Sequence, residues 1–314
     1  MELLAISYHY IGDEDKYHKG IYPISGERLI LQLDAISKNW KFISEDDLVS
    51  AISRKQDLPE KSCLITFDDA LKSQYDLAVP ILEERDIPAI FFVSTKHLTE
   101  QKAYLVHKVH YLLSKVPIKE LIKSFEQSYL HIIGKPINWS VMDASSATSH
   151  YQYDDVDTAR FKFLINHVLS MDVTEYVVGE LFKKYIGNEA DFCKSLYMSQ
   201  QQMDSLQANN LFTLGLHTHS HSNVAQDIFI NDIEKNNNIL SEQLNIKARG
   251  IAYPFGSITL ELYEQKLKKG VKSLGLDYGL TTQRKISSDF NNPFLLGRFT
   301  AEDITFGKRP IIEI

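Results

Sequence analysis

The chain is poor in cysteine and contains no long apolar run. Its 314 residues include two cysteines, Cys63 and Cys193, which lie far apart and match no CxxC or metal-ligand spacing. We interpret them as reduced thiols in apolar surroundings. No window of about 18 apolar residues occurs, so we expect no membrane span. The first residues lack the basic segment and long apolar core of a signal peptide, and we therefore expect a cytoplasmic protein.

An excess of basic residues is also missing. Lysine and arginine number 34 against 41 aspartates and glutamates, which gives a formal net charge of -7. Because affinity for phosphates needs clustered lysine and arginine, this balance argues against a nucleic-acid partner. The content of 44% hydrophobic and 24% charged residues is that of an ordinary globular protein.

Short apolar runs alternate with amphipathic stretches in most of the chain. Residues 3–8, 63–67 and 88–93 read as buried strands, and helical periodicity lies between them. This alternation predicts parallel strands joined by crossover helices, and hence an α/β fold. From about residue 104 to 195 the pattern is mostly helical. We therefore predict a single α/β domain over residues 1–314, with a mostly helical insertion at about 104–195.

Two adjacent carboxylates, Asp68 and Asp69, follow the second predicted strand. At a strand end the chain turns, so both side chains can face one site. One carboxylate could then bind a metal while the other takes a proton. Taken alone, the pair is better explained by an Asx turn before a helix.

Three alternate histidines, His217, His219 and His221, follow a later predicted strand. On one helical turn, a spacing of four residues puts the rings of His217 and His221 on the same side. Such a pair is a usual zinc site, and we expect His219 to point away from it. A polar loop is the less favoured explanation. His107 and His110, in the predicted insertion, have no nearby strand-end carboxylate, so we interpret them as packing or surface residues.

The stretch Ala252-Tyr253-Pro254-Phe255-Gly256 also follows a predicted strand. A tight Pro and Gly turn there could expose a backbone N–H that stabilises an oxyanion. His9 follows the first strand. In a parallel α/β barrel the carboxyl ends of all strands form one face, so these distant residues should converge. One carboxylate and two histidines leave the open position that a catalytic zinc requires.

These residues resemble the motifs of the polysaccharide deacetylase family, also called the NodB-homology or carbohydrate esterase 4 family. Its first motif, TFDD followed by glycine, stands here as residues 66–70, and its second, H-[S/T]-x-x-H, as residues 217–221. Residues 252–256 look like the third. Residues 24–52 resemble the segment that precedes TFDD in the subgroup that deacetylates poly-β-1,6-N-acetylglucosamine. The resemblance covers roughly residues 1–100 and 195–300 and implies a distorted barrel of seven or eight strand–helix units.

The resemblance also implies a role for each matching residue. Asp68 would be the catalytic base, and the backbone N–H near Phe255 would help to form the oxyanion hole. Asp69, His217 and His221 would bind a divalent metal. Zinc is the default, and cobalt, nickel and iron also suit these ligands. The implied reaction removes an N-acetyl group from an amino-sugar glycan or its precursor and releases acetate.

The sequence departs from the family pattern at several positions. Ala70 replaces the motif glycine, and its methyl group would strain a turn of positive φ. Many relatives take their general acid from a histidine near the C-terminus, but no histidine follows His221. The Tyr8-His9 pair resembles one in the poly-N-acetylglucosamine subgroup, so we assign the acid to His9. A hydrogen-bonded core histidine is the alternative.

One family arginine is also replaced. Two residues before the proline of the third motif, many relatives have an arginine where this chain has Ala252. We hypothesise that Arg298, on a late predicted strand, takes its place by pairing with Asp68 and keeping it ionised. A structural or surface arginine explains Arg298 equally well.

Two other functions remain open. The first is an amidohydrolase or deformylase acting on a small soluble substrate such as a nucleotide sugar, which a cytoplasmic location would favour. The second is a non-catalytic glycan-binding protein that has lost its acid. The missing C-terminal histidine favours this second function, and His9 argues against it.

Overall fold

The computed structural model describes residues 1–15, 20–141, 144–151, 154–256 and 258–314. The chain forms two compact units. The first comprises residues 1–14, 23–101 and 193–314, and the second comprises residues 15–22 and 102–192. The predicted insertion corresponds largely to the second unit, and its residues 142–143 and 152–153 lie outside the described part. That the whole chain is one domain carrying an insertion stays a prediction.

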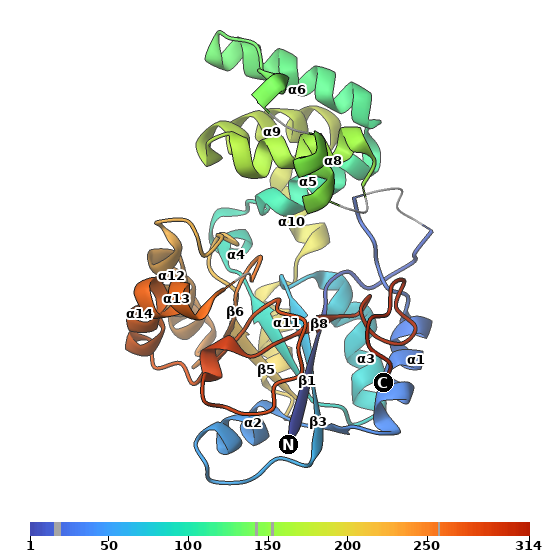
Figure 1. Cartoon of the computed structure of the whole chain (residues 1–314), viewed down its shortest axis with the longest axis vertical. Helices are drawn as coiled ribbons and strands as arrows, with labels where there is room; N and C mark the ends of the chain where they lie inside the picture. Colours follow the sequence, from blue (N-terminus) through green and yellow to red (C-terminus); the bar gives the residue numbers. More distant parts are fainter. Residues whose placement is uncertain (16–19, 142–143, 152–153, 257) are drawn as a thin grey trace. The chain divides into compact units, whose positions relative to one another are not determined.

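The first unit is built on a curled parallel sheet (Figure 1). Its order is β7-β6-β5-β4-β3-β1-β8, and β2 pairs with the start of β3. A parallel bridge between Leu280 and Leu296 connects β7 to the segment leading into β8, which pairs with β1. The two edges are thus brought together, and the predicted α/β barrel is confirmed. The strands are β1 (Glu2–Tyr8), β2 (Lys41–Phe42), β3 (Lys61–Asp68), β4 (Ala89–Val93), β5 (Phe212–Leu216), β6 (Gly250–Ala252), β7 (Tyr278–Leu280) and β8 (Phe299–Thr300).

Alternation along the strands separates an outer core from an inner one. Outward side chains of β1 and β3 pack with the helices, whereas Leu3, Leu64 and Phe92 belong to a separate core that fills the barrel. The inward row of β3 continues from Leu64 to Thr66 and Asp68, all buried. Along β3 the barrel interior is therefore apolar at Leu64 and polar at its carboxyl end.

Helices surround this sheet, and several begin at side-chain caps. The Ser44 hydroxyl accepts a hydrogen bond from the Asp47 N–H while the Asp47 carboxylate accepts one from the Ser44 N–H, and this capping box starts α2. The helices are α1 (Gly26–Ser37), α2 (Glu45–Ile52), α3 (Val79–Glu84), α4 (Lys96–Glu100), α11 (Gln200–Gln207), α12 (Phe229–Leu244), α13 (Leu260–Leu262) and α14 (Lys268–Ser273), with π-helical segments η1 (Gln74–Ala78) and η4 (Tyr263–Leu267) and the 3-10 turn η5 (Pro293–Leu295).

The described residues between 102 and 196 form helices and no named strand. A separate apolar core, which includes Leu112 of α5, Phe125 of α6 and Phe161 of α8, joins several of these helices. They are α5 (Leu105–Lys115), α6 (Ile118–Ile133), α7 (Ala144–His150), α8 (Val156–Phe163), α9 (Met171–Tyr185) and α10 (Glu189–Leu196), with η2 (Trp139–Val141) and η3 (Leu164–Val168). Among the described residues, no helix is both long and apolar enough to cross a membrane.

Candidate functional site

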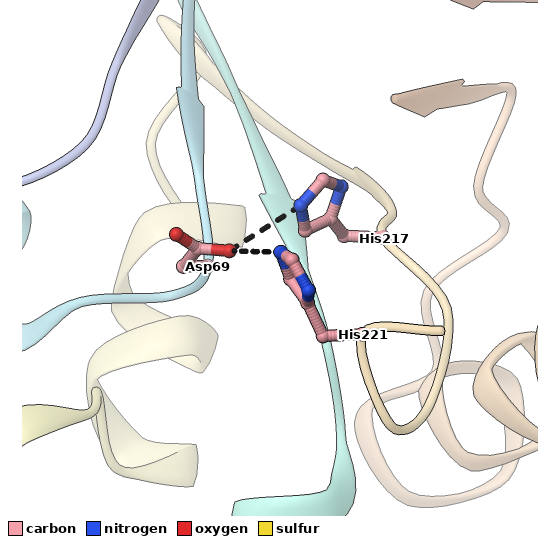
Figure 2. Close-up of side chains that lie close together, drawn as sticks. All are labelled: Asp69, His217 and His221. Atoms are coloured by element: carbon pink, nitrogen blue, oxygen red, sulfur yellow. Dashed lines mark ion pairs between the residues drawn. The ribbon is translucent and has the colours of Figure 1, made fainter. Parts of the chain in front are cut away.

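Three predicted metal ligands converge at the carboxyl end of the sheet. Asp69 directly follows β3, His217 directly follows β5, and His221 lies four residues further on. Figure 2 shows the two rings turned toward the Asp69 carboxylate. Its Oδ1 is 3.3 Å from Nε2 of His217 and 3.2 Å from Nε2 of His221. Asp69 and His217 are buried and His221 nearly so.

The spacing of these atoms fits a common metal ion. Ligand bonds of about 2.0–2.1 Å in a tetrahedron put neighbouring ligand atoms about 3.3–3.4 Å apart, close to the distances from the Asp69 oxygen. Direct N–H···O bonds span about 2.7–3.2 Å, so both distances lie at or beyond the long end of that range. Nδ1 of His217 lies 2.7 Å from the carbonyl oxygen of Ala252, so a neutral ring donates there and presents the Nε2 lone pair to the site. The donor set suits zinc and leaves room for further ligands, and its metal-binding role stays a prediction.

Left-handed backbone conformations orient these side chains. Residues 217–221 form a loop and not the helical turn that we expected, with φ of 61° at Thr218 and 59° at His221. The φ angles of Asp69 and Ala70 are 78° and 55°, so the alanine that replaces the motif glycine does occupy a strained position. Each such conformation costs about 1–3 kcal/mol, and strain of this kind is concentrated at functional sites.

His219 points away from the other two histidines, as expected. Its Nδ1 lies 2.9 Å from the Thr95 hydroxyl and its Nε2 lies 2.9 Å from Oε1 of Glu100. Partial burial favours the neutral acid of Glu100, but hydrogen bonds from Lys235 and His219 outweigh it and lower the pKa of Glu100 to about 2. His219 therefore anchors the loop from its far side.

Asp68, the predicted base, pairs with Arg298 inside the barrel. Nη1 of Arg298 donates to Oδ1 of Asp68 at 2.7 Å and to the Thr66 hydroxyl at 3.3 Å, and both charged groups are buried. Burial alone would raise the pKa of Asp68. The positive charge of Arg298 outweighs burial and lowers that pKa. The hypothesised pair is present, and the catalytic roles of its members stay predictions.

His9 lies on the other side of the same carboxylate. Its Nε2 is 3.7 Å from Oδ2 of Asp68, and its side chain is 43% exposed. This exposure excludes the alternative of a core histidine. The carbonyl oxygen of His9 accepts a hydrogen bond from Nε2 of Gln74 at 3.0 Å, and the same nitrogen donates to the Asp68 carbonyl at 2.6 Å. Gln74 thus ties the backbones of the predicted acid and base together.

Phe255 follows β6 beside the histidine pair. The residue is 48% exposed, and its ring meets the His221 ring nearly at right angles, with centroids 5.0 Å apart. Its φ is 58°, and its N–H donates no hydrogen bond to any described residue. A side chain on the next residue, Gly256, would meet the backbone nitrogen of Thr282 at 2.6 Å, so only glycine fits there. An oxyanion hole needs a backbone N–H that is available to donate to the substrate, and the N–H of Phe255 meets this need. Its role in an oxyanion hole stays a prediction.

Three polar residues beside the site were not predicted from the sequence. Gln74 stands in a helix with no distinguishing pattern. Asp232 and Asn236 are buried on α12, on the face that also carries Ile233 and Leu240. Polar residues at the apolar spacing of an amphipathic helix are a sequence signal that could have revealed them.

His107 and His110 lie on α5, where His107 is buried. Among the described residues, only Asp69, His217 and His221 form a group of three with metal-ligand spacing.

The sequence profile of the polysaccharide deacetylase family matches residues 55–163 and 165–279. A poly-β-1,6-N-acetyl-D-glucosamine N-deacetylase of Staphylococcus aureus is 27% identical over 163 residues, or 46% of this chain and 54% of that protein. The corresponding enzyme of Staphylococcus epidermidis is 25% identical over 164 residues, or 46% of this chain and 55% of that protein. The chain therefore spans about half the length of these relatives.

Solved structures show the same fold. The deacetylase PplD of Streptococcus pyogenes, in complex with acetate, superposes with a TM-score of 0.56 at 16% identity and covers 96% of this chain and 92% of its own. IcaB of Ammonifex degensii superposes with a TM-score of 0.57 at 18% identity and covers 95% of this chain and 91% of its own. At these identities the likeness concerns the fold alone.

Proposed function

Because the chain belongs to the polysaccharide deacetylase family, we propose that it is a metal-dependent hydrolase that removes N-acetyl groups from an amino-sugar polysaccharide. The names of the staphylococcal relatives support a β-1,6-linked N-acetylglucosamine polymer as the substrate. The observation that carries the proposal is the convergence of Asp69, His217 and His221 beside an Asp68 carboxylate paired with a buried arginine.

Asp69, His217 and His221 would hold a divalent metal, which supplies Lewis-acid polarisation of the acetyl carbonyl and of a water. Asp68, kept ionised by Arg298, takes a proton from the attacking water. The N–H of Phe255 donates a hydrogen bond to the oxygen that becomes negative during attack, a contribution worth about 2.7–4 kcal/mol in comparable sites.

Departure of the amine needs a proton, because an amine anion is a very poor leaving group. Protonated His9 supplies it to the sugar nitrogen as the carbon–nitrogen bond breaks. The products are acetate and a free amino sugar. Nε2 of His9 lies 3.7 Å from Oδ2 of Asp68, so the proposed acid and base lie at the same site. This arrangement favours the hydrolase over the non-catalytic alternative.

Separate loss of the metal and of the base tests the proposal. We expect Asp69→Asn to lose bound metal and activity together, because it removes a charged ligand. Asp68→Asn should keep its metal and lose about 10²–10⁴-fold in kcat, the usual contribution of a general base. Metal content is measured by elemental analysis, and acetate release is measured on β-1,6-linked N-acetylglucosamine oligomers and on a nucleotide sugar.

The exposed Asp204 on α11 provides the matched control, and Asp204→Asn should leave both quantities unchanged. A fully active Asp68→Asn variant would remove the base assignment. A wild-type protein without metal after divalent-metal supplementation would refute the mechanism. Turnover of the nucleotide sugar alone would replace the polymer by a soluble substrate.

A further inference from the structure

Two buried polar residues of α12 hold the loop that carries both histidine ligands. We propose that Asp232 and Asn236 are positioning residues that fix residues 217–221 in a geometry able to bind metal. The inference rests on the proposed function, because it takes His217 and His221 as metal ligands. Neither α12 residue touches the converging atoms of the site, so each would act through the loop.

Asn236 connects the first histidine to the neighbouring strand. Its Oδ1 accepts a hydrogen bond from the N–H of His217 at 3.1 Å. Its Nδ2 donates to the carbonyl oxygen of Val93 at 3.2 Å and to the hydroxyl of Thr95 at 3.1 Å. The Thr95 hydroxyl in turn contacts Nδ1 of His219 at 2.9 Å. One buried amide therefore links the end of β4 to the start of the histidine loop.

Asp232, one helical turn earlier, holds the second half of the loop. Its carboxylate accepts hydrogen bonds from the Ser220 N–H at 3.0 Å, from the Ser220 hydroxyl at 3.0 Å and from the Ser222 hydroxyl at 2.7 Å. Its carbonyl oxygen accepts one from the His219 N–H at 3.0 Å. These bonds reach the residues on both sides of His221.

The loop needs such support because its backbone is strained. Thr218 and His221 are both left-handed, a conformation that non-glycine residues keep only when their surroundings impose it. The N–H groups of residues 217, 219 and 220 point to α12 or β4 and bond there, which leaves the rings of His217 and His221 directed at Asp69. Apolar residues at positions 232 and 236 would suit the packed face of α12 better, so the polar ones are explained by the loop.

Metal affinity measures this positioning directly. Partners that orient the ligands of a metal typically change its affinity by about 10–100-fold when they are removed. We therefore expect Asn236→Ala to weaken zinc binding by about that factor, measured by competition with a chromophoric chelator. The visible absorption of the cobalt-substituted variant should also differ from that of the wild type, because the ligand geometry relaxes.

The chain contains its own matched control. Asn238 lies two residues further along α12 and is exposed, so Asn238→Ala makes the same substitution on the same helix without touching the loop. Its zinc affinity and cobalt spectrum should equal those of the wild type. Ser220→Ala removes only a hydroxyl from a partly exposed position, and we expect about a 2- to 10-fold loss of affinity from its hydrogen bonds to Asp232.

The outcomes separate this inference from the proposed function. A folded Asn236→Ala variant with wild-type zinc affinity and spectrum would overturn the inference while leaving the metal site intact. Should Asn236→Ala fail to fold, Ser220→Ala decides, and wild-type affinity there would likewise overturn it. A wild-type chain that binds neither zinc nor cobalt would instead refute the proposed function.

Discussion

Replacing Arg298 with methionine tests whether a buried guanidinium keeps Asp68 ionised. The two groups are 2.7 Å apart, and their side chains are 3% and 2% exposed. Removing one partner of a buried pair leaves an uncompensated charge and costs about 3–5 kcal/mol of folding free energy. His9 cannot compensate, because it lies 3.7 Å from Asp68 and is 43% exposed, a geometry worth about 0–1 kcal/mol.

The loss of folding free energy in Arg298→Met should be larger at neutral pH than at acid pH. Burial favours the neutral acid of Asp68, but Arg298 outweighs it and lowers the pKa in the folded chain. A carboxyl group whose pKa falls on folding contributes stability above its unfolded pKa of about 3.9, and this stability is lost as the pH falls through the folded pKa. The wild type should therefore exceed Arg298→Met in folding free energy most at neutral pH. Because burial alone raises the pKa of Asp68, the variant takes up a proton first, and the gap should begin to narrow above about pH 4. In the variant, the acid limb of kcat/KM should move to higher pH.

Urea unfolding at several pH values measures the first effect, and acetate release over the same range measures the second. Arg284→Met is the control, because Arg284 is 50% exposed and pairs with Asp303 at 3.2 Å. We expect it to change stability by less than about 1 kcal/mol. If Arg298→Met unfolds like the wild type at neutral pH, or if its acid limb stays in place, Arg298 does not control the ionisation of Asp68.

Two further predictions concern His9 and Glu45. His9→Gln should lose about 10²–10⁴-fold in kcat while keeping its metal content and its stability to within about 1 kcal/mol, and a fully active variant would exclude the acid role. Glu45 is buried on α2 and accepts a hydrogen bond from the Tyr278 hydroxyl at 2.6 Å. Burial raises its pKa despite that bond, so its contribution to stability is fully present below its unfolded pKa of about 4.3 and is lost as the pH rises through the folded pKa. Glu45→Gln should therefore gain stability relative to wild type between about pH 4 and pH 7, measured by thermal unfolding, and a difference that does not grow with pH would contradict this.

The fold was largely readable from the sequence because parallel strands are buried on both faces. The apolar runs at 3–8, 63–67 and 88–93 became β1, β3 and β4 with bounds that differ by at most two residues. The π-helical turns were not predicted, since Tyr75 and its neighbours keep the same apolar spacing in an α-helix. The late predicted strand is shorter than expected, since β8 holds only Phe299 and Thr300 and Arg298 lies directly before it.

The site was readable in its residue types but not in its backbone. Histidines and carboxylates at strand ends can be recognised from short sequence motifs. Asn236 and Asp232, in contrast, bond to a loop more than ten residues away, and no short motif predicts those bonds. Left-handed φ is usually announced by glycine or asparagine. Of the ten described non-glycine residues with positive φ, five lie at the site, and none of these five is an asparagine: Asp69, Ala70, Thr218, His221 and Phe255. At about 1–3 kcal/mol each, these conformations need more support than any one segment can provide. This support comes from the packing of β3, β5, β6 and α12 against one another. For that reason the left-handed backbone conformations at the site are the part of this structure that is hardest to predict from its sequence.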